Sequence, residues 1–405
     1  MGFIPPPLAS QPHEEPDFSN HFHSDSSSSS LSSQSSLPSV PSLNSILKEN
    51  PNIPHHCITT LKGHPSSVFS LVLSEKYLYS GSSNGDLCMW SRSTSNHEDS
   101  AENVVFSCKS AVKCLVILGD KLFSAHQDHK IRVWKIDDST PYKKHKCIAI
   151  LPTLYDRVTR LFLAKNYVEI RRHKKCTWVH HVDTVSALAL SKDGCFIYSA
   201  SWDRTFKVWR TSDFKCLESV WNAHDDAINA IISSNDGFVY TGSADRKIKV
   251  WRNKEGNKKH ILVYVLEKHK SAVNALALSS DGSVLYSGAC DRSIIVWEKT
   301  SNDGNMVVAG ALRGHTKAIL CLAAVLDLVC SGSADKTVRI WRKEIGKMYS
   351  CLAVLEGHKR PVKCLTATAD SCSADNSSAI SIPYLVYSGS LDCDVKVWQI
   401  WVPFS

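Results

Sequence analysis

The sequence predicts an all-β protein, a seven-bladed β-propeller preceded by a disordered N-terminal tail. The first observation is repetition, because seven tryptophans close seven similar segments and four of the six intervals between them are 42 to 46 residues long. That period suits a blade of four antiparallel strands. The second observation is the alternation of apolar and polar residues, rich in Val, Ile and Tyr, inside each segment. The third is a set of turns such as Asp193-Gly194 and Asp281-Gly282, which are typical of hairpins.

Each repeat carries four marker positions in a fixed order. A His is followed four residues later by Val or Ile and then by an alternating strand. A Ser or Thr comes next, four residues before an Asp, and a Trp follows that Asp by six residues. The clearest copies are HDDAINAIISSNDGFVYTGSADRKIKVW at 224–251, HKSAVNALALSSDGSVLYSGACDRSIIVW at 269–297 and HTKAILCLAAVLDLVCSGSADKTVRIW at 315–341.

This pattern resembles the WD40 family of β-propellers, from about residue 55 to the C-terminus. In that family the four side chains form a hydrogen-bonded tetrad that stiffens each blade. Two blades depart from the pattern, because Asn84 replaces the Asp of the first and Cys108 stands where the second should have its His. Blade by blade, the tetrad positions are His64, Ser80, Asn84 and Trp90; Ser124, Asp128 and Trp134; His181, Ser199, Asp203 and Trp209; His224, Thr241, Asp245 and Trp251; His269, Ser287, Asp291 and Trp297; His315, Ser331, Asp335 and Trp341; and His358, Ser388, Asp392 and Trp398.

The tetrads contain the residue types of a Ser–His–Asp hydrolase, but we interpret them as structural. A catalytic site is not repeated in every blade, and a buried serine gives a substrate no access. A missing member should leave buried groups unpaired at about 1–3 kcal/mol, so we expect the second blade to be the least rigid. We predict no enzymatic activity, no cofactor and no metal site, since the chain has no nucleophile elbow, phosphate loop or paired metal-ligand motif.

The two ends of the propeller should meet in one blade. Only residues 399–405 follow Trp398, and this segment is too short for a further outer strand. The strand-like segment 57–61 has no blade of its own, so we expect it to pair with the last blade and remove a free sheet edge. Deleting residues 1–54 should then leave a folded chain, whereas deleting residues 1–62 should not.

The N-terminal region, residues 1–54, precedes the propeller, which we assign to residues 55–405. It contains a serine-dominated tract that runs from Ser26 to about Ser45. Such a segment buries too little apolar surface to offset its chain entropy, so we expect it to be disordered. It is either an inert leader or a tail tuned by phosphorylation.

The repeat is interrupted between Trp134 and Trp209 by an insert that spans roughly residues 152–180. If 147–151 is the outer strand of blade 2, the insert leaves from the top face, beside the His-bearing loops; if 176–179 is that strand, it leaves from the bottom. We favour the top. A basic run predicts either a site for an acidic partner or nuclear import, or a solvated loop face. This run consists of Arg171, Arg172, His173, Lys174 and Lys175.

The resemblance also implies where partners dock, because WD40 propellers commonly bind them on the top face. Positions three and five residues after the His, and one before the Asp, point to that face. We select Trp202 as the strongest candidate, since interface hot spots favour Trp. Arg204 directly follows a tetrad Asp, and we expect it to belong to a rim of basic residues around the top face. The remaining candidates are Phe69, Asn229, Asn274, Leu320, Lys363 and Leu391.

The resemblance implies a non-catalytic scaffold or adaptor whose partners are other proteins. The insert, with Lys-Asn-Tyr-Val and Arg-Arg-His-Lys-Lys, further resembles the plant JINGUBANG-like subgroup of WD40 proteins. That likeness implies a regulator that acts with transcription or signalling factors in pollen or other development. One alternative is a substrate receptor of an E3 ubiquitin ligase, although no Asp follows a closing Trp. Another is nucleic-acid association through the insert, although a net charge of +8 is small for that role.

The composition limits the cellular compartments in which we expect this chain. No apolar run reaches the length of a membrane span. The odd count of 15 cysteines, without a signal peptide, favours a reducing compartment. We expect a monomeric propeller in the cytoplasm, the nucleus or both, without a membrane partner.

Overall fold

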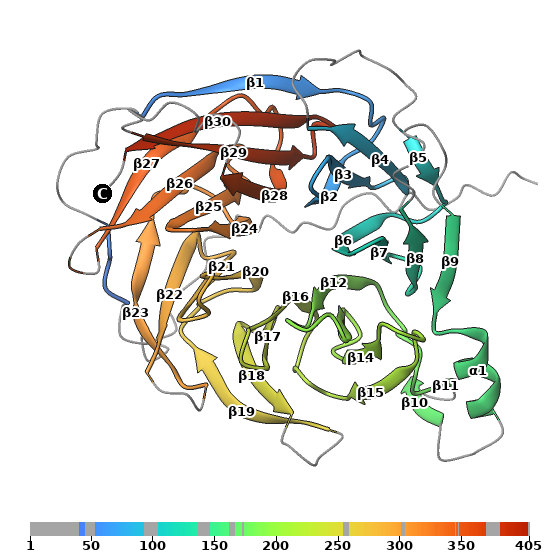
Figure 1. Ribbon diagram of the computed structural model, residues 1–405. Helices are drawn as coiled ribbons and strands as arrows, with labels where there is room; N and C mark the ends of the chain where they lie inside the picture. Colours follow the sequence, from blue (N-terminus) through green and yellow to red (C-terminus); the bar gives the residue numbers. More distant parts are fainter. Residues whose placement is uncertain are drawn as a thin grey trace, which may run out of the picture. The chain divides into compact units, whose positions relative to one another are not determined.

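The computed structural model of this chain describes residues 40–44, 53–92, 104–136, 146–161, 167–171, 174–253, 259–300, 304–344, 346, 348–369 and 381–403. Within these residues, seven four-stranded antiparallel sheets follow one another around a ring (Figure 1). The inner strand of each sheet packs against the inner strand of the next, and the last returns to the first. The predicted seven-bladed propeller is therefore confirmed.

Six blades are built from strands in chain order, and the seventh combines both ends of the propeller. From inside to outside, the strands are β2 (Val68–Leu73), β3 (Tyr77–Ser82), β4 (Asp86–Ser91) and β5 (Val104–Ser107) in blade 1; β6 (Val112–Leu118), β7 (Lys121–His126), β8 (Ile131–Lys135) and β9 (Lys146–Leu151) in blade 2; β12 (Val185–Leu190), β13 (Phe196–Ser201), β14 (Phe206–Arg210) and β15 (Cys216–Val220) in blade 3; β16 (Ile228–Ser233), β17 (Phe238–Ser243), β18 (Lys247–Asn253) and β19 (His260–Glu267) in blade 4; β20 (Val273–Leu278), β21 (Val284–Ala289), β22 (Ser293–Lys299) and β23 (Met306–Arg313) in blade 5; β24 (Ile319–Val325), β25 (Leu328–Ser333), β26 (Val338–Lys343) and β27 (Tyr349–Leu355) in blade 6; and β28 (Val362–Ala369), β29 (Ser381–Ser390), β30 (Val395–Pro403) and β1 (His55–Leu61) in blade 7.

The burial of each strand follows from its place in the blade. The second strands β17, β21 and β25 are buried at every residue, because they lie between two strands and between two neighbouring blades. Sequences such as Phe-Val-Tyr-Thr-Gly-Ser suit this setting, since a strand covered on both faces needs no polar face. The outer strand β9 alternates between exposed and partly buried residues, as a strand with one solvated face should.

Glycines in the second strands let neighbouring blades approach closely. A Cβ atom on Gly81 of blade 1 would lie 2.5 Å from Val112 Cγ1 of blade 2. A Cβ on Gly389 of blade 7 would lie 2.8 Å from Val68 Cγ1 of blade 1. The same small-to-branched contact is thus used between successive blades and at the closure of the ring.

The ring is closed a second time by the N-terminal strand. β1 pairs antiparallel with β30, with Cys57 opposite Trp398 and Leu61 opposite Val395. Both ends of the propeller therefore lie in one sheet, where β1 covers the edge that β30 would otherwise expose.

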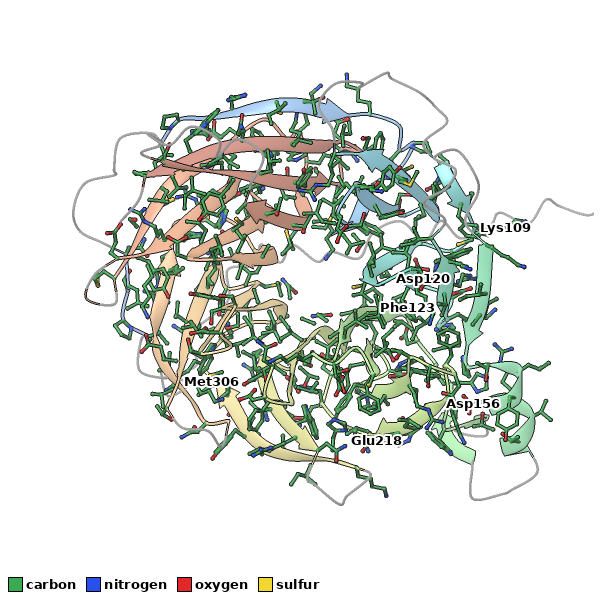
Figure 2. All side chains as sticks on the ribbon, in the orientation of Figure 1. Lys109, Asp120, Phe123, Asp156, Glu218 and Met306 are labelled. Atoms are coloured by element: carbon green, nitrogen blue, oxygen red, sulfur yellow. The ribbon has the colours of Figure 1, made fainter. Side chains whose placement is uncertain are left out.

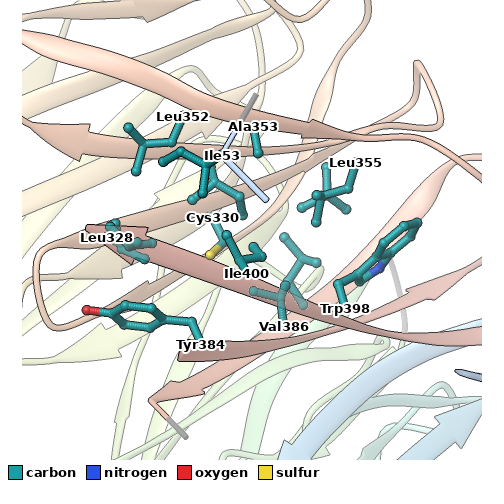
Figure 3. Packing of buried hydrophobic residues seen from close by; sticks show 14 of the residues in the cluster. Ile53, Leu328, Cys330, Leu352, Ala353, Leu355, Tyr384, Val386, Trp398 and Ile400 are labelled. Carbon is teal, nitrogen blue, oxygen red and sulfur yellow. The ribbon is translucent and has the colours of Figure 1, made fainter. Parts of the chain in front are cut away.

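The expected boundary of the tail, residue 54, needs a correction. Residues 40–44 are described and lie between the outer strands of blades 5 and 6, with Leu43 only 8% exposed. Ile53 is also 8% exposed and packs in the cluster that contains Leu352 and Ile400 (Figure 3). Isolated apolar residues within this polar region thus fold onto the propeller. Residues 1–39 and 45–52 lie outside the described residues.

The insert between blades 2 and 3 contains α1 (Leu154–Leu161) and a hairpin of β10 (Tyr167–Arg171) and β11 (Lys174–Thr177). Residues 147–151 belong to β9, the outer strand of blade 2, and Leu151 pairs with Ile131 at the start of β8. The insert therefore leaves beside the turn that carries Asp128, on the side of the His-bearing loops. No helix among the described residues has the length and apolarity needed to cross a bilayer.

Candidate protein-interaction face

The four marker positions form one hydrogen-bonded chain in blades 3 to 7. In blade 3, Trp209 Nε1 donates to Ser199 Oγ at 2.8 Å, Ser199 Oγ lies 2.8 Å from His181 Nε2, and His181 Nδ1 lies 2.9 Å from Asp203 Oδ2. Because a carboxylate only accepts, Nδ1 carries the proton and the Ser199 hydroxyl donates to Nε2. The same contacts, at 2.7–2.9 Å, join the tetrads of the four later blades.

Burial and hydrogen bonding shift the pKa values of several tetrad side chains. Burial alone would raise the pKa of Asp245, but its hydrogen bond with His224 lowers that pKa to about 2. Burial lowers the pKa of His181, so this imidazole stays neutral beside its carboxylate. Ser199 is fully buried and is engaged by both an indole and an imidazole. A substrate cannot reach a hydroxyl that is fully buried, which supports a structural role for the tetrads.

Blade 2 has a histidine in an unexpected place. Cys108 was predicted to leave the tetrad without one, but His126 Nε2 lies 2.7 Å from Ser124 Oγ, and Trp134 Nε1 donates to the same oxygen at 2.8 Å. The released Asp128 instead accepts two hydrogen bonds from Arg132, at 3.1 and 2.6 Å. The prediction of a missing histidine was therefore wrong. A search at the fixed spacing cannot detect an imidazole that lies two residues after the serine on the serine's own strand, β7.

Blade 1 keeps its histidine but changes what lies on the other nitrogen. His64 Nε2 lies 2.6 Å from Ser80 Oγ, and Cys88 Sγ lies 3.6 Å from His64 Nδ1. Asn84 does not take the place of the Asp, because its side chain bonds Ser82 and Asp86 instead. Burial lowers the pKa of His64 to about 4. The first two blades thus hold neutral histidines without a carboxylate bonded to Nδ1.

Three side chains from three blades meet at the top face. Lys113 Nζ lies 4.4 Å from the centroid of the Phe69 ring and 5.5 Å from that of Trp202. Trp202 is 42% exposed, although most large aromatic side chains of the described blades are buried. Burial, and then the charge of Lys363, lower the pKa of Lys113 to about 8. We call Phe69, Lys113 and Trp202 the top-face cluster. The sequence did not predict Lys113, because top-face positions were counted from the tetrad His. In blade 2 that position, five residues before Lys113, is Cys108.

Comparison with known proteins agrees with this geometry. The family WD40, described as "WD domain, G-beta repeat", matches residues 55–91, 173–210, 214–252, 261–298, 306–342 and 349–399. The chain belongs to the WD40 family. The matched ranges leave out strands β6 to β9 of blade 2, the blade whose tetrad histidine lies on β7 and not in the loop before the inner strand.

The similar proteins share repeats rather than whole length with this WD40 chain. WD repeat-containing protein pop2 of Schizosaccharomyces pombe is 26% identical over 187 residues, which are 40% of this chain and 24% of that protein. WD repeat-containing protein pop1 of the same species is 29% identical over 86 residues, 18% of this chain and 11% of pop1. Nuclear distribution protein nudF 2 of Penicillium rubens is 28% identical over 142 residues, 28% of this chain and 31% of that protein. This chain therefore spans less than a third of the length of each.

One solved structure shows the same fold. The crystal structure of the WD40 beta propeller domain of Doa1 has a TM-score of 0.61 and 20% sequence identity, and the match covers 85% of this chain and 96% of that domain. At this level of identity the likeness concerns the fold alone.

The other predicted top-face residues of the WD40 propeller have varied surroundings. Asn229 Nδ2 donates to Val273 O at 3.0 Å, and Asn274 Nδ2 donates to Ile319 O at 2.8 Å, so both amides tie neighbouring inner strands together. Leu320, Lys363 and Leu391 are partly buried.

The basic rim is formed by turn residues. Arg204 is exposed and has a φ of 66°, in the left-handed region. Three other exposed basic residues directly after a tetrad Asp share this conformation: Arg246, Arg292 and Lys336. Their repetition follows from the turn, which directs each side chain away from the sheet.

The basic run of the insert lies on its hairpin. Arg171 ends β10 and Lys174 begins β11, two positions that pair across the hairpin, and Lys175 pairs with Glu169. Arg172 and His173 lie outside the described residues. Within the described part of the chain, His, Cys, Asp and Glu form no group of three or more that could hold a metal ion.

Proposed function

We propose that this chain is a non-catalytic adaptor that holds an acidic segment of a partner protein against its top-face cluster. WD40 propellers generally act as protein-interaction scaffolds. The observation that carries the proposal is the placement of Lys113, a partly buried ammonium between the rings of Phe69 and Trp202. Burial and Lys363 lower the pKa of Lys113, so a nearby carboxylate would relieve the cost of keeping this lysine charged.

The chemistry of the surrounding face favours the same kind of partner. Lys363 and the exposed Arg204 add positive charge, and Trp202 offers a large apolar surface that a partner can cover. Charge complementarity steers association, while a buried aromatic anchor supplies much of the affinity. A segment with both acidic and apolar residues fits these two features.

The sequence resemblance supports a narrower proposal about biological role. The insert resembles JINGUBANG-like plant proteins, and on that basis we propose regulatory partners such as transcription or signalling factors of pollen or other development. We further propose a monomeric propeller in the cytoplasm or nucleus, with the odd count of 15 cysteines as support.

Affinity purification of tagged full-length chains tests the adaptor function. Wild-type protein should retain a reproducible set of partners that Trp202→Ala and Lys113→Ala both lose, and retention should weaken with added salt. Leu262→Ala is a matched control, because this leucine of β19 is 45% exposed on an outer strand. Identical partner sets for wild type and both cluster variants would overturn the proposal. A chain without residues 152–180 tests whether the insert contributes.

A further inference from the structure

Residues 40–44, Val-Pro-Ser-Leu-Asn, form an extra parallel strand between two blades. Leu43 N donates to Ala311 O at 2.9 Å, and Ala311 N donates to Pro41 O at 2.9 Å, so the segment pairs with β23 of blade 5. On its other side, Tyr349 N donates to Leu43 O at 2.8 Å, which joins it to β27 of blade 6. The segment thus uses the outer strands of both blades, as a bound peptide does when it extends a sheet.

The groove between β23 and β27 is shaped around a leucine. Leu43 is 8% exposed and packs in a cluster with Leu312, Trp341 and Tyr349. A Cβ atom on Gly310 would lie 2.4 Å from Leu43 Cγ and 2.9 Å from Pro41 O. All three of the nearest atoms around that position belong to the 40–44 segment. The glycine in this outer strand therefore makes room for the 40–44 segment.

Polar contacts recognise the residues on both sides of the leucine. Arg313 N donates to Asn44 Oδ1 at 2.9 Å, and the Asn44 side-chain amide donates to Arg313 O. The two groups pair as one residue of a strand pairs with another. Arg313 Nη2 also donates to Val40 O at 2.7 Å. The propeller backbone thus recognises the asparagine that directly follows the leucine, through two hydrogen bonds to its side chain.

We propose that the groove between β23 and β27 is a docking site for an extended protein segment of the type Pro-x-Leu-Asn. Residues 40–44 fill the groove in cis, and a partner segment of the same chemistry fills it in trans when they leave. Eight residues separate Asn44 from Ile53, which is fixed in the core. A short tether of this kind gives the cis segment a millimolar effective concentration. A partner segment therefore binds weakly while residues 40–44 occupy the groove. It binds strongly to a released chain, in which residues 40–44 have left the groove.

Fluorescence anisotropy with a labelled peptide of residues 38–46, Pro-Ser-Val-Pro-Ser-Leu-Asn-Ser-Ile, tests this site. All proteins are full-length chains. Leu43→Asp should expel the cis segment, because it places a charge in an apolar groove, and should bind the peptide at least about tenfold more tightly than wild type. Adding Gly310→Ala should abolish this gain, since the new methyl group occupies the place of the leucine. A peptide that itself carries Leu43→Asp should not bind.

Controls separate the groove from general effects of substitution. Val307→Ala, at a residue of β23 that is 47% exposed, should leave peptide binding to the Leu43→Asp chain unchanged. Near-ultraviolet circular dichroism checks that each variant is folded; if Leu43→Asp is not, Asn44→Ala releases the cis segment by removing its paired amide. Equal peptide affinity for wild type and released chain, absence of binding to the released chain, or binding that survives Gly310→Ala would each overturn the proposal.

Discussion

His126 and Ser124, two residues apart on β7, share a hydrogen bond of 2.7 Å that completes the tetrad of blade 2. Five other blades carry a serine at the position of His126, and in four of them this serine donates to a carbonyl of the loop before the inner strand; in blade 3, Ser201 Oγ donates to Asp183 O at 3.0 Å. His126 Nδ1 lies 3.2 Å from the corresponding carbonyl, Ser110 O. A carbonyl only accepts, so Nδ1 is the protonated nitrogen, as in blades 3 to 7. The imidazole of His126 therefore makes two contacts that separate side chains make in blade 3, where His181 bonds the tetrad serine and Ser201 bonds the loop carbonyl.

Replacing His126 should consequently destabilise the propeller strongly. His126→Ala leaves a buried cavity and removes the hydrogen-bond partner of Ser124, which together should cost about 2–4 kcal/mol in free energy of unfolding. Cys108→Ser is the matched variant, because a serine hydroxyl can still donate to Ser110 O, as Cys108 Sγ does at 3.1 Å. We expect this second change to cost less than about 1 kcal/mol. Urea unfolding measures both, and equal costs would show that His126 does not complete the tetrad.

The same relationship shows why the sequence predicted most blades but misread the second. A tetrad depends on local spacing, since the Ser and the Trp lie on the two strands of one hairpin and the Asp lies in its turn, and such spacing is visible in one sequence. The chemical requirement, however, is an imidazole nitrogen near the serine, and not a histidine at one position. His126, two residues after Ser124 in a strand pattern that buries both, was the available signal.

The 40–44 segment was missed for a different reason. Composition averages over many residues, so one leucine in a serine-rich tract does not alter the prediction of disorder. Burial, in contrast, depends on whether a groove exists for that leucine. A signal was present in the partner strand, because Gly310 interrupts an otherwise apolar outer strand, and glycine in a strand marks a place where another backbone approaches.

Acid should weaken the propeller in two stages. Burial lowers the pKa values of His64 and His126 to about 4. The unfolded chain, with histidine pKa values near 6.5, therefore binds more protons between these limits. The contribution of these two histidines to the free energy of unfolding is fully present above pH 6.5. It is lost as the pH falls toward 4, by up to about 3 kcal/mol for each histidine. Burial lowers the pKa values of His181 and His358 as well, which adds to the same window.

The second stage belongs to the tetrad carboxylates. Despite burial, the histidine partners lower the pKa values of Asp245 and Asp291 from the usual 3.8 to about 2. The stability that they contribute is present above 3.8 and is lost as the pH falls toward 2. Urea unfolding at pH 7.5, 5.5 and 4.5 measures the first stage, and His64→Gln should make the loss shallower. A free energy of unfolding that is constant from pH 7.5 to 4.5 would contradict the assignment.

The insert should depend on one buried carboxylate. Asp156 of α1 is fully buried, and its Oδ2 accepts a hydrogen bond of 2.9 Å from Cys216 N at the start of β15; Figure 2 shows Asp156 beside this outer part of blade 3. Asp156→Ala removes the acceptor and should cost about 1–3 kcal/mol. Limited proteolysis should then cut within residues 152–180 more quickly. Asp156→Asn keeps an acceptor oxygen and should be cut at a rate close to that of wild type; equally fast cleavage of wild type and Asp156→Ala would exclude this anchor.

Stepwise truncation should separate the roles of the N-terminal residues. Removing residues 1–39 keeps every contact that the described residues make with one another, so the melting temperature should not change. Removing residues 1–52 also deletes Leu43, whose burial contributes about 1.5–3 kcal/mol, so this chain should fold but melt earlier. Removing residues 1–62 deletes β1 and exposes the whole edge of β30, which should abolish cooperative folding. Thermal unfolding followed by circular dichroism distinguishes the three, and a soluble, cooperatively melting chain of residues 63–405 would show that β1 is dispensable for closure of the ring.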